Sequence, residues 1–224
     1  MLQSFLTGAP DAVPFTPKAL NVLMAAYAER GNVDITLNLL EEFYKNEMAP
    51  DVDSFTFALE AVGKATARMV KNEKLRMAPE KKARAIESYL SVADSILSRM
   101  EEPQGPEGKT IVPTNHLIRN YVEFLCLVKQ VGTATDVVVD ALEREAESED
   151  APNIVDNKII LRVAIANAEE GNFDMARRLA ASVSEPLPFM DAKIDKIEES
   201  LLSRTPQRQD GSLEDSQFAT RGPL

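Results

Sequence analysis

The stretch KALNVLMAAYAERGNVDITLNLLEEFYKNEMAPDVDSFTFALEAV, residues 18–62, decides the fold. Its apolar residues recur at the three- and four-residue spacing of amphipathic helices, which predicts helices over 17–30 and 33–47. Gly31 interrupts the first helix and Pro50 ends the second, and the short turn between them favours an antiparallel hairpin. The buried faces are expected to hold Leu20, Leu23, Met24 and Tyr27, then Ile35, Leu39, Leu40 and Phe43.

Helical periodicity continues along the chain, and no segment sustains the alternation of a β-strand. A turn containing Gly132 is expected between two of the later helices, and Gly171-Asn172-Phe173-Asp174 repeats the pattern Gly31-Asn32-Val33-Asp34. Further helices are predicted from Asp53 to about Ala65 and over 81–101, 114–130, 134–147, 154–169, 173–184 and 190–203.

Pairs of these helices define the predicted domain, which is all-α. Its expected form is a right-handed α-α superhelix, or solenoid, because each hairpin can bury its apolar face only against the next one. Residues 1–16 are expected to be an irregular lead-in and 204–224 a disordered tail. The helical-repeat domain, 17–203, comprises hairpins 17–48, 53–101 with a basic insertion at 66–80, 114–147 and 154–184, and a capping helix at 190–203.

The composition argues against several classes of function. The only histidine, His116, lies in no catalytic motif, and Cys126 is the only cysteine, so neither an internal disulfide nor Cys/His zinc spacing can arise. No apolar run reaches the length of about 20 residues that spans a bilayer. We therefore expect no enzyme, cofactor, metal, small-molecule substrate or membrane partner.

Several positions within 18–62 resemble the pentatricopeptide repeat family. The resemblance is carried by Asn21, Leu23, Met24, Tyr27, Gly31 and Phe43 and by the junction Pro50-Asp51-Val52. Thr56 follows Asn21 by 35 residues, the period of that family, and the third hairpin opens with the similar PTNHLI, residues 113–118. The resemblance is weaker elsewhere, and tetratricopeptide-like repeats remain an alternative for the last two hairpins.

This resemblance implies single-stranded RNA as the ligand, with one base contacted by each repeat. Carried over to this chain, the base-contacting candidates are Asn21 with Asp51, a pair that favours uracil in the family, and then Thr56 and Asn115. It also implies a mitochondrial or plastid location, although the N-terminal residues show no targeting peptide and a complete chain would be expected in the cytoplasm.

A basic segment is the candidate for contact with the phosphate backbone. Residues 64–84 hold eight basic residues and two acidic ones, within a chain whose net charge is −11. A solvated insertion is the alternative reading of this segment. The candidate phosphate contacts are Lys64, Arg68, Lys71, Lys74, Arg76, Lys81, Lys82 and Arg84.

The overall acidity keeps a second hypothesis open, a scaffold of the same architecture that holds a protein partner in its concave groove. The first hairpin region, 18–53, has three basic and seven acidic residues, which disfavours phosphate contact there. Three or four repeats also contact too few bases for useful specificity, so we expect either a fragment of a longer array or a diverged member.

Overall fold

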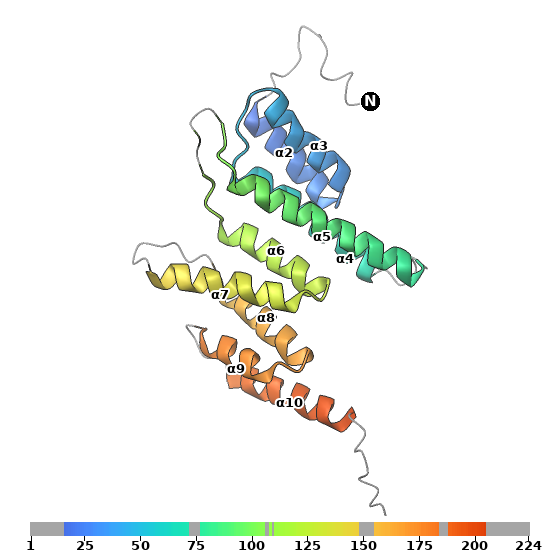
Figure 1. The fold of residues 1–224 in the computed structure, drawn as a ribbon, viewed down its shortest axis with the longest axis vertical. Helices are drawn as coiled ribbons and strands as arrows, with labels where there is room; N and C mark the ends of the chain where they lie inside the picture. Colours follow the sequence, from blue (N-terminus) through green and yellow to red (C-terminus); the bar gives the residue numbers. More distant parts are fainter. Residues whose placement is uncertain are drawn as a thin grey trace, which may run out of the picture.

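The computed structural model of the chain is all-α, as predicted (Figure 1). It describes residues 16–71, 77–105, 108, 110–147, 155–183 and 188–204. Within these residues no β-strand forms. The helices are α2 (Pro17–Glu29), α3 (Val33–Lys45), α4 (Val52–Lys71), α5 (Pro79–Glu101), α6 (Asn115–Leu127), α7 (Val131–Glu147), α8 (Asn157–Glu169), α9 (Phe173–Ala181) and α10 (Pro188–Arg204).

The helices pack in the pairs α2–α3, α4–α5, α6–α7 and α8–α9, which form four hairpins in the described residues. The first helices of the hairpins, α2, α4, α6 and α8, lie in a row in which each packs against the next. α3 packs on α4 and α7 on α8, which ties each of these hairpins to the following one, and α10 covers α8 and α9. The hairpins therefore follow one another along the long axis of the molecule (Figure 1).

One apolar cluster runs through the hairpins from Leu20 to Val183. The predicted buried faces of the first hairpin are largely correct, since Leu20, Met24 and Phe43 are fully buried. Leu23 is the exception, because 40% of it is exposed. An apolar residue at helical spacing is therefore not always buried.

The four first helices begin in the same way. In each of them, the side chain of the capping residue accepts a hydrogen bond from the backbone N–H three residues later. This bond satisfies a donor that has no acceptor within the helix. The four capping bonds join Thr16 to Ala19 N at 3.2 Å, Asp51 to Ser54 N at 3.0 Å, Thr114 to Leu117 N at 3.4 Å and Asp156 to Ile159 N at 2.9 Å.

Three of these helices also end alike. α2, α6 and α8 are each 13 residues long, and each is closed by a residue with positive φ, namely Gly31, Lys129 or Gly171. The N–H of the next residue donates back into the last turn, at 3.0 Å to Tyr27 O, 2.9 Å to Leu125 O and 2.9 Å to Asn167 O. The same cap-to-turn register thus recurs in the first, third and fourth hairpins.

Two predicted boundaries are wrong. Gly132 does not break the chain, because it lies in the first turn of α7 and the left-handed turn falls at Lys129. The expected insertion at 66–80 is helical over 66–71, where α4 continues, and again from Pro79, where α5 begins. The periodicity of α4 weakens there because its last turns extend beyond the length of the other first helices and have fewer residues to bury.

Other boundaries shift by a few residues or fall outside the description. α8 begins at Asn157 and not at 154, and α9 ends at Ala181 and not at 184. Thr16, placed in the predicted lead-in, caps α2, and Arg204, placed in the predicted tail, ends α10. The remaining residues of those two predicted segments, 1–15 and 205–224, lie outside the described part of the chain.

Candidate nucleic-acid interface

The two residues of the predicted base-contacting pair touch each other at the junction of the first two hairpins. Asn21 Nδ2 lies 3.0 Å from each carboxylate oxygen of Asp51, and Ser54 Oγ donates to Asn21 Oδ1 at 2.8 Å. Asn21 is half-buried and Asp51 is exposed, so both remain accessible at the edge of the row of first helices. Asp51 also caps α4, which fixes the position of its carboxylate.

The common register identifies the equivalent positions in the later hairpins. Asn21 is the fifth residue after its cap, Thr16, and it contacts Asp51, the cap of the next first helix. In the third hairpin the fifth residue after the cap is Arg119, whose Nη1 lies 3.8 Å from Asp156, the cap of α8. A polar contact from this position to the next cap therefore occurs at the first and third junctions.

The register does not support Asn115 as an equivalent of Asn21. Asn115 directly follows its cap, Thr114, and so lies four positions before Arg119. The sequence match at 113–118 is therefore out of phase with the structural repeat, because similar residue types occupy the first turn of one helix and the second turn of the other.

Thr56 has the register of Asn21 but a different environment. It is buried, with 1% of its surface exposed, and its hydroxyl donates to Val52 O at 2.7 Å. A side chain that is enclosed by the packing of α4 and bonded within its own helix presents no polar atom to a base. The structure thus gives no basis for the predicted base contact of Thr56.

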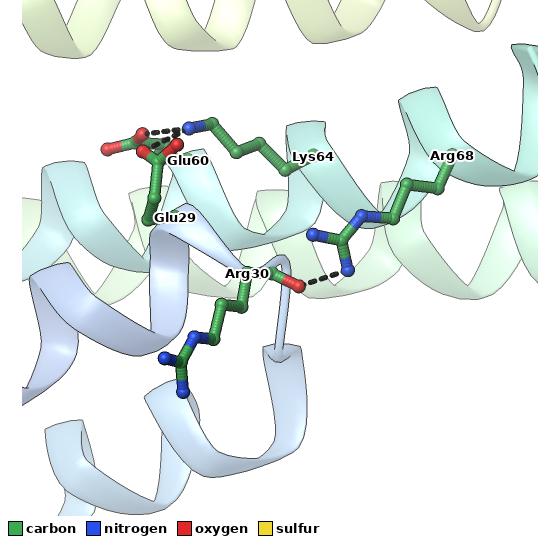
Figure 2. A network of polar contacts seen from close by, with 5 residues as sticks. All are labelled: Glu29, Arg30, Glu60, Lys64 and Arg68. Carbon is green, nitrogen blue, oxygen red and sulfur yellow. Dashed lines mark hydrogen bonds and ion pairs between the residues drawn. The ribbon is translucent and has the colours of Figure 1, made fainter.

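Two of the predicted phosphate contacts are engaged inside the protein. Lys64 forms ion pairs with Glu29 and, at 3.0 Å, with Glu60 (Figure 2). Its hydrogen bond to Glu29 raises the pKa of Lys64 and lowers that of Glu29. Arg68 donates to the backbone carbonyl of Arg30, the C-cap residue that follows α2 (Figure 2). These two cations bind the end of the first helix to α4.

Lys71, the next basic residue of α4, lines an open groove that runs across α4, α6 and α8 and has a volume of about 500 Å³. Lys158 and Arg162, one turn apart on α8, line its opposite side. All three are exposed, and none forms an ion pair with a carboxylate of the described residues.

The two carboxylates of the groove have basic partners. Glu60 pairs with Lys64 at 3.0 Å and Glu123 with Arg119 at 3.1 Å. The positive charges of Lys71, Lys158 and Arg162 are consequently unpaired within the described residues. The groove therefore carries a net positive charge although the whole chain is acidic.

The floor of the groove is partly apolar and contains an unsatisfied amide. Gly63, Ala67, Phe124 and Leu127 supply the apolar part. Asn120 also lines the groove, and its Nδ2 is enclosed without a hydrogen-bond acceptor, which is uncommon for a buried donor.

The remaining predicted phosphate contacts do not line this groove. Lys81, Lys82 and Arg84 lie in the first two turns of α5, on the second helix of their hairpin. Lys74 and Arg76 fall outside the described residues. The basic segment is therefore divided between two helices and does not form one patch.

Sequence reasoning missed Asn120, Lys158 and Arg162. The only local signal was the pair of basic residues four positions apart at the start of a predicted helix, which is ordinary for an exposed helix face. Their meeting with Lys71 depends on the packing of three hairpins that are far apart in the sequence.

The groups considered for other chemistry occupy ordinary environments. Cys126 is buried, and this burial raises the pKa of its thiol, while His116 is exposed in the first turn of α6. Across the described ranges, no cluster of three or more His, Cys, Asp or Glu residues is placed to hold a metal ion. In that same part of the chain, none of the helices combines the length and apolarity needed to cross a bilayer.

Comparison with known proteins assigns no family to the chain. No family model matches it, and no curated protein sequence is significantly similar to it.

Proposed function

We propose that the chain is a pentatricopeptide-like module, a right-handed α-α superhelix that binds single-stranded RNA along its row of first helices. The observation that supports this most strongly is the groove across α4, α6 and α8, where Lys71, Lys158 and Arg162 have no carboxylate partner in the described residues. Cations left unpaired inside an acidic protein favour a local, strongly anionic ligand.

The shape and chemistry of the groove favour a single strand. Its opening lies between helices, and its volume of about 500 Å³ suits individual nucleotides, whereas a duplex would have to rest on the rim. The apolar floor suits a base and the cations suit a phosphate, the two parts that an unpaired nucleotide exposes.

Base contacts are proposed for the polar pairs at the hairpin junctions. Asn21 and Asp51 keep the role expected from the sequence, and Arg119 with Asp156 replaces Asn115 in the third hairpin. An amide can both donate and accept, so Asn21 can exchange part of its contact with Asp51 for the edge of a base.

The experiment is fluorescence anisotropy with a labelled U-rich RNA oligomer at 50 and 200 mM salt. If the three groove cations together neutralise one phosphate, log K should fall with log salt with a slope of about −0.7, or roughly 2.6-fold over this range. Asn21→Ala should weaken binding of the U-rich oligomer more than that of an A-rich one. Absence of binding at micromolar protein would contradict the proposal.

A protein partner is the second candidate, and one observation favours it. Val22 and Leu23, adjacent on α2, are large apolar residues that are 63% and 40% exposed. If this surface binds a protein, Val22→Ser and Leu23→Ser should abolish recovery of that protein without changing RNA affinity. An RNA-binding chain that is indifferent to these substitutions would argue against the scaffold.

A further inference from the structure

The groove is formed where three hairpins meet, and its charges come from both sides. Lys71 extends from the last turn of α4, and Lys158 and Arg162 come from the first two turns of α8, with α6 between them. Like charges that share one groove repel each other, and the two carboxylates of the groove, Glu60 and Glu123, form their ion pairs with other basic residues. An anion placed between them would remove it.

The floor offers a second, independent sign of a missing partner. Asn120 Nδ2 has no acceptor, although the residue lines the groove and is only half-buried. The terminal torsion of an asparagine is broad, so the NH₂ group can turn to meet a ligand in the groove. An oxygen held above α6 would then satisfy the donor.

We infer that this groove is a phosphate site, which holds one phosphodiester group between Lys71 and the Lys158–Arg162 pair and accepts a hydrogen bond from Asn120. The guanidinium of Arg162 can grip two phosphate oxygens, and the lysines act as point charges. That the phosphate belongs to RNA rests on the proposed function, whereas the site itself rests on the groove alone.

The position of the site has a consequence for stability. A phosphate bound there would connect α4 of the second hairpin to α8 of the fourth, across the third. Ligand that binds only the folded protein raises its unfolding temperature. The same anion should therefore bind and stabilise, whether it is supplied as pyrophosphate or as a short RNA oligomer.

Thermal unfolding of the full chain provides the first test. Pyrophosphate and a U-rich oligomer should each raise the midpoint relative to sodium chloride at equal ionic strength. A rise with pyrophosphate and no RNA binding would retain the phosphate site and overturn the proposed function. No rise with either probe would overturn the site.

Charge variants locate the contact. Replacing both groove cations of α8, Lys158→Gln with Arg162→Gln, should make the salt slope of RNA binding shallower by up to about 0.7, the share of the one phosphate held in the groove. The matched control, Lys81→Gln with Lys82→Gln on α5, removes the same charge outside the groove and should change it little. Equal effects of the two double variants would show that only net charge matters and would overturn the assignment.

The Asn120→Leu variant distinguishes a ligand-binding role of Asn120 from a purely structural role. Because this substitution removes an unsatisfied buried donor, it should leave the free protein as stable or more stable while weakening the binding of both probes several-fold. A purely structural asparagine would show the reverse, a loss of stability with unchanged affinity. Unchanged affinity for both probes would overturn the proposed contact between Asn120 and the phosphate.

Discussion

Three residues end the first helices of their hairpins with positive φ, and their surroundings differ. Gly31 has φ of 55° and Gly171 has φ of 86°, and both were recognisable in the sequence as helix ends. Lys129, with φ of 66°, was not, because a lysine carries no such signal. Among the first helices, the sequence therefore showed the turn only where glycine occupies it, although the backbone makes the same turn at the end of α2, α6 and α8.

The two glycines should differ in what they tolerate. A Cβ at Gly31 would lie 2.8 Å from Ala65 N of α4, whereas one at Gly171 would meet nothing within 4 Å. Gly171→Ala should cost about 1 kcal/mol for the left-handed backbone, and Gly31→Ala roughly 1–3 kcal/mol more for the clash. Urea unfolding of both variants measures the difference, and equal losses would contradict the close approach of α2 to α4.

Lys129 should gain from replacement by glycine. Lys129→Gly removes the steric cost of positive φ and should raise the free energy of unfolding by about 0.5–1 kcal/mol. The exposed ion pair with Glu169, at 3.7 Å, contributes little to this balance. Lys129→Ala is the control, because it removes the same ion pair but keeps the strained backbone, and it should not stabilise the protein in urea unfolding.

At the scale of the elements, helix type was predictable and helix register was not. Amphipathic periodicity located each hairpin, because a helix face that must be buried leaves its mark on every turn. The predicted equivalence of Asn115 and Asn21 does not hold in the structure, because it compared residue types and not positions relative to the helix cap. The structural register instead follows from the cap Thr114 and the turn at Lys129.

The contact between α5 and α6 gives a prediction on pH. Tyr121 donates to Asp94 at 3.4 Å, and burial, with the charge of Asp94, raises the pKa of its phenol to about 12. The folded protein therefore keeps this proton where the unfolded chain loses it, so stability should fall as pH rises from about 10 to 12. Tyr121→Phe should flatten this fall in urea midpoints measured across that range, and an unchanged slope would exclude Tyr121 as its source.

At the scale of the whole molecule, the hairpins contact their neighbours in chain order, so damage at one end should remain local. Ile194 of α10 is fully buried in a small apolar cluster with Ala168 and Ala176, separate from the main core. Ile194→Ala should cost about 2–5 kcal/mol of local stability.

Hydrogen exchange shows where that loss falls. Amides of α8, α9 and α10 should exchange faster in the Ile194→Ala variant, while those of α2 and α4 keep their protection. Ile160→Ala, fully buried in the main core, is the comparison and should accelerate exchange on both sides of α8. Uniform acceleration by Ile194→Ala would mean that the chain unfolds as one unit.

By itself, the sequence determined the all-α class, because this depends on periodicity and turn residues. The family resemblance pointed to Asn21 and Asp51, which the structure places in contact. Only the tertiary structure decided which cations remain unpaired. Lys64 and Arg68 look no different from Lys71 in the sequence, yet they contact the end of α2, while Lys71 lines one groove with Lys158 and Arg162 and has no carboxylate partner in the described residues. Charge is a property of a residue, but its availability depends on the neighbours that packing provides.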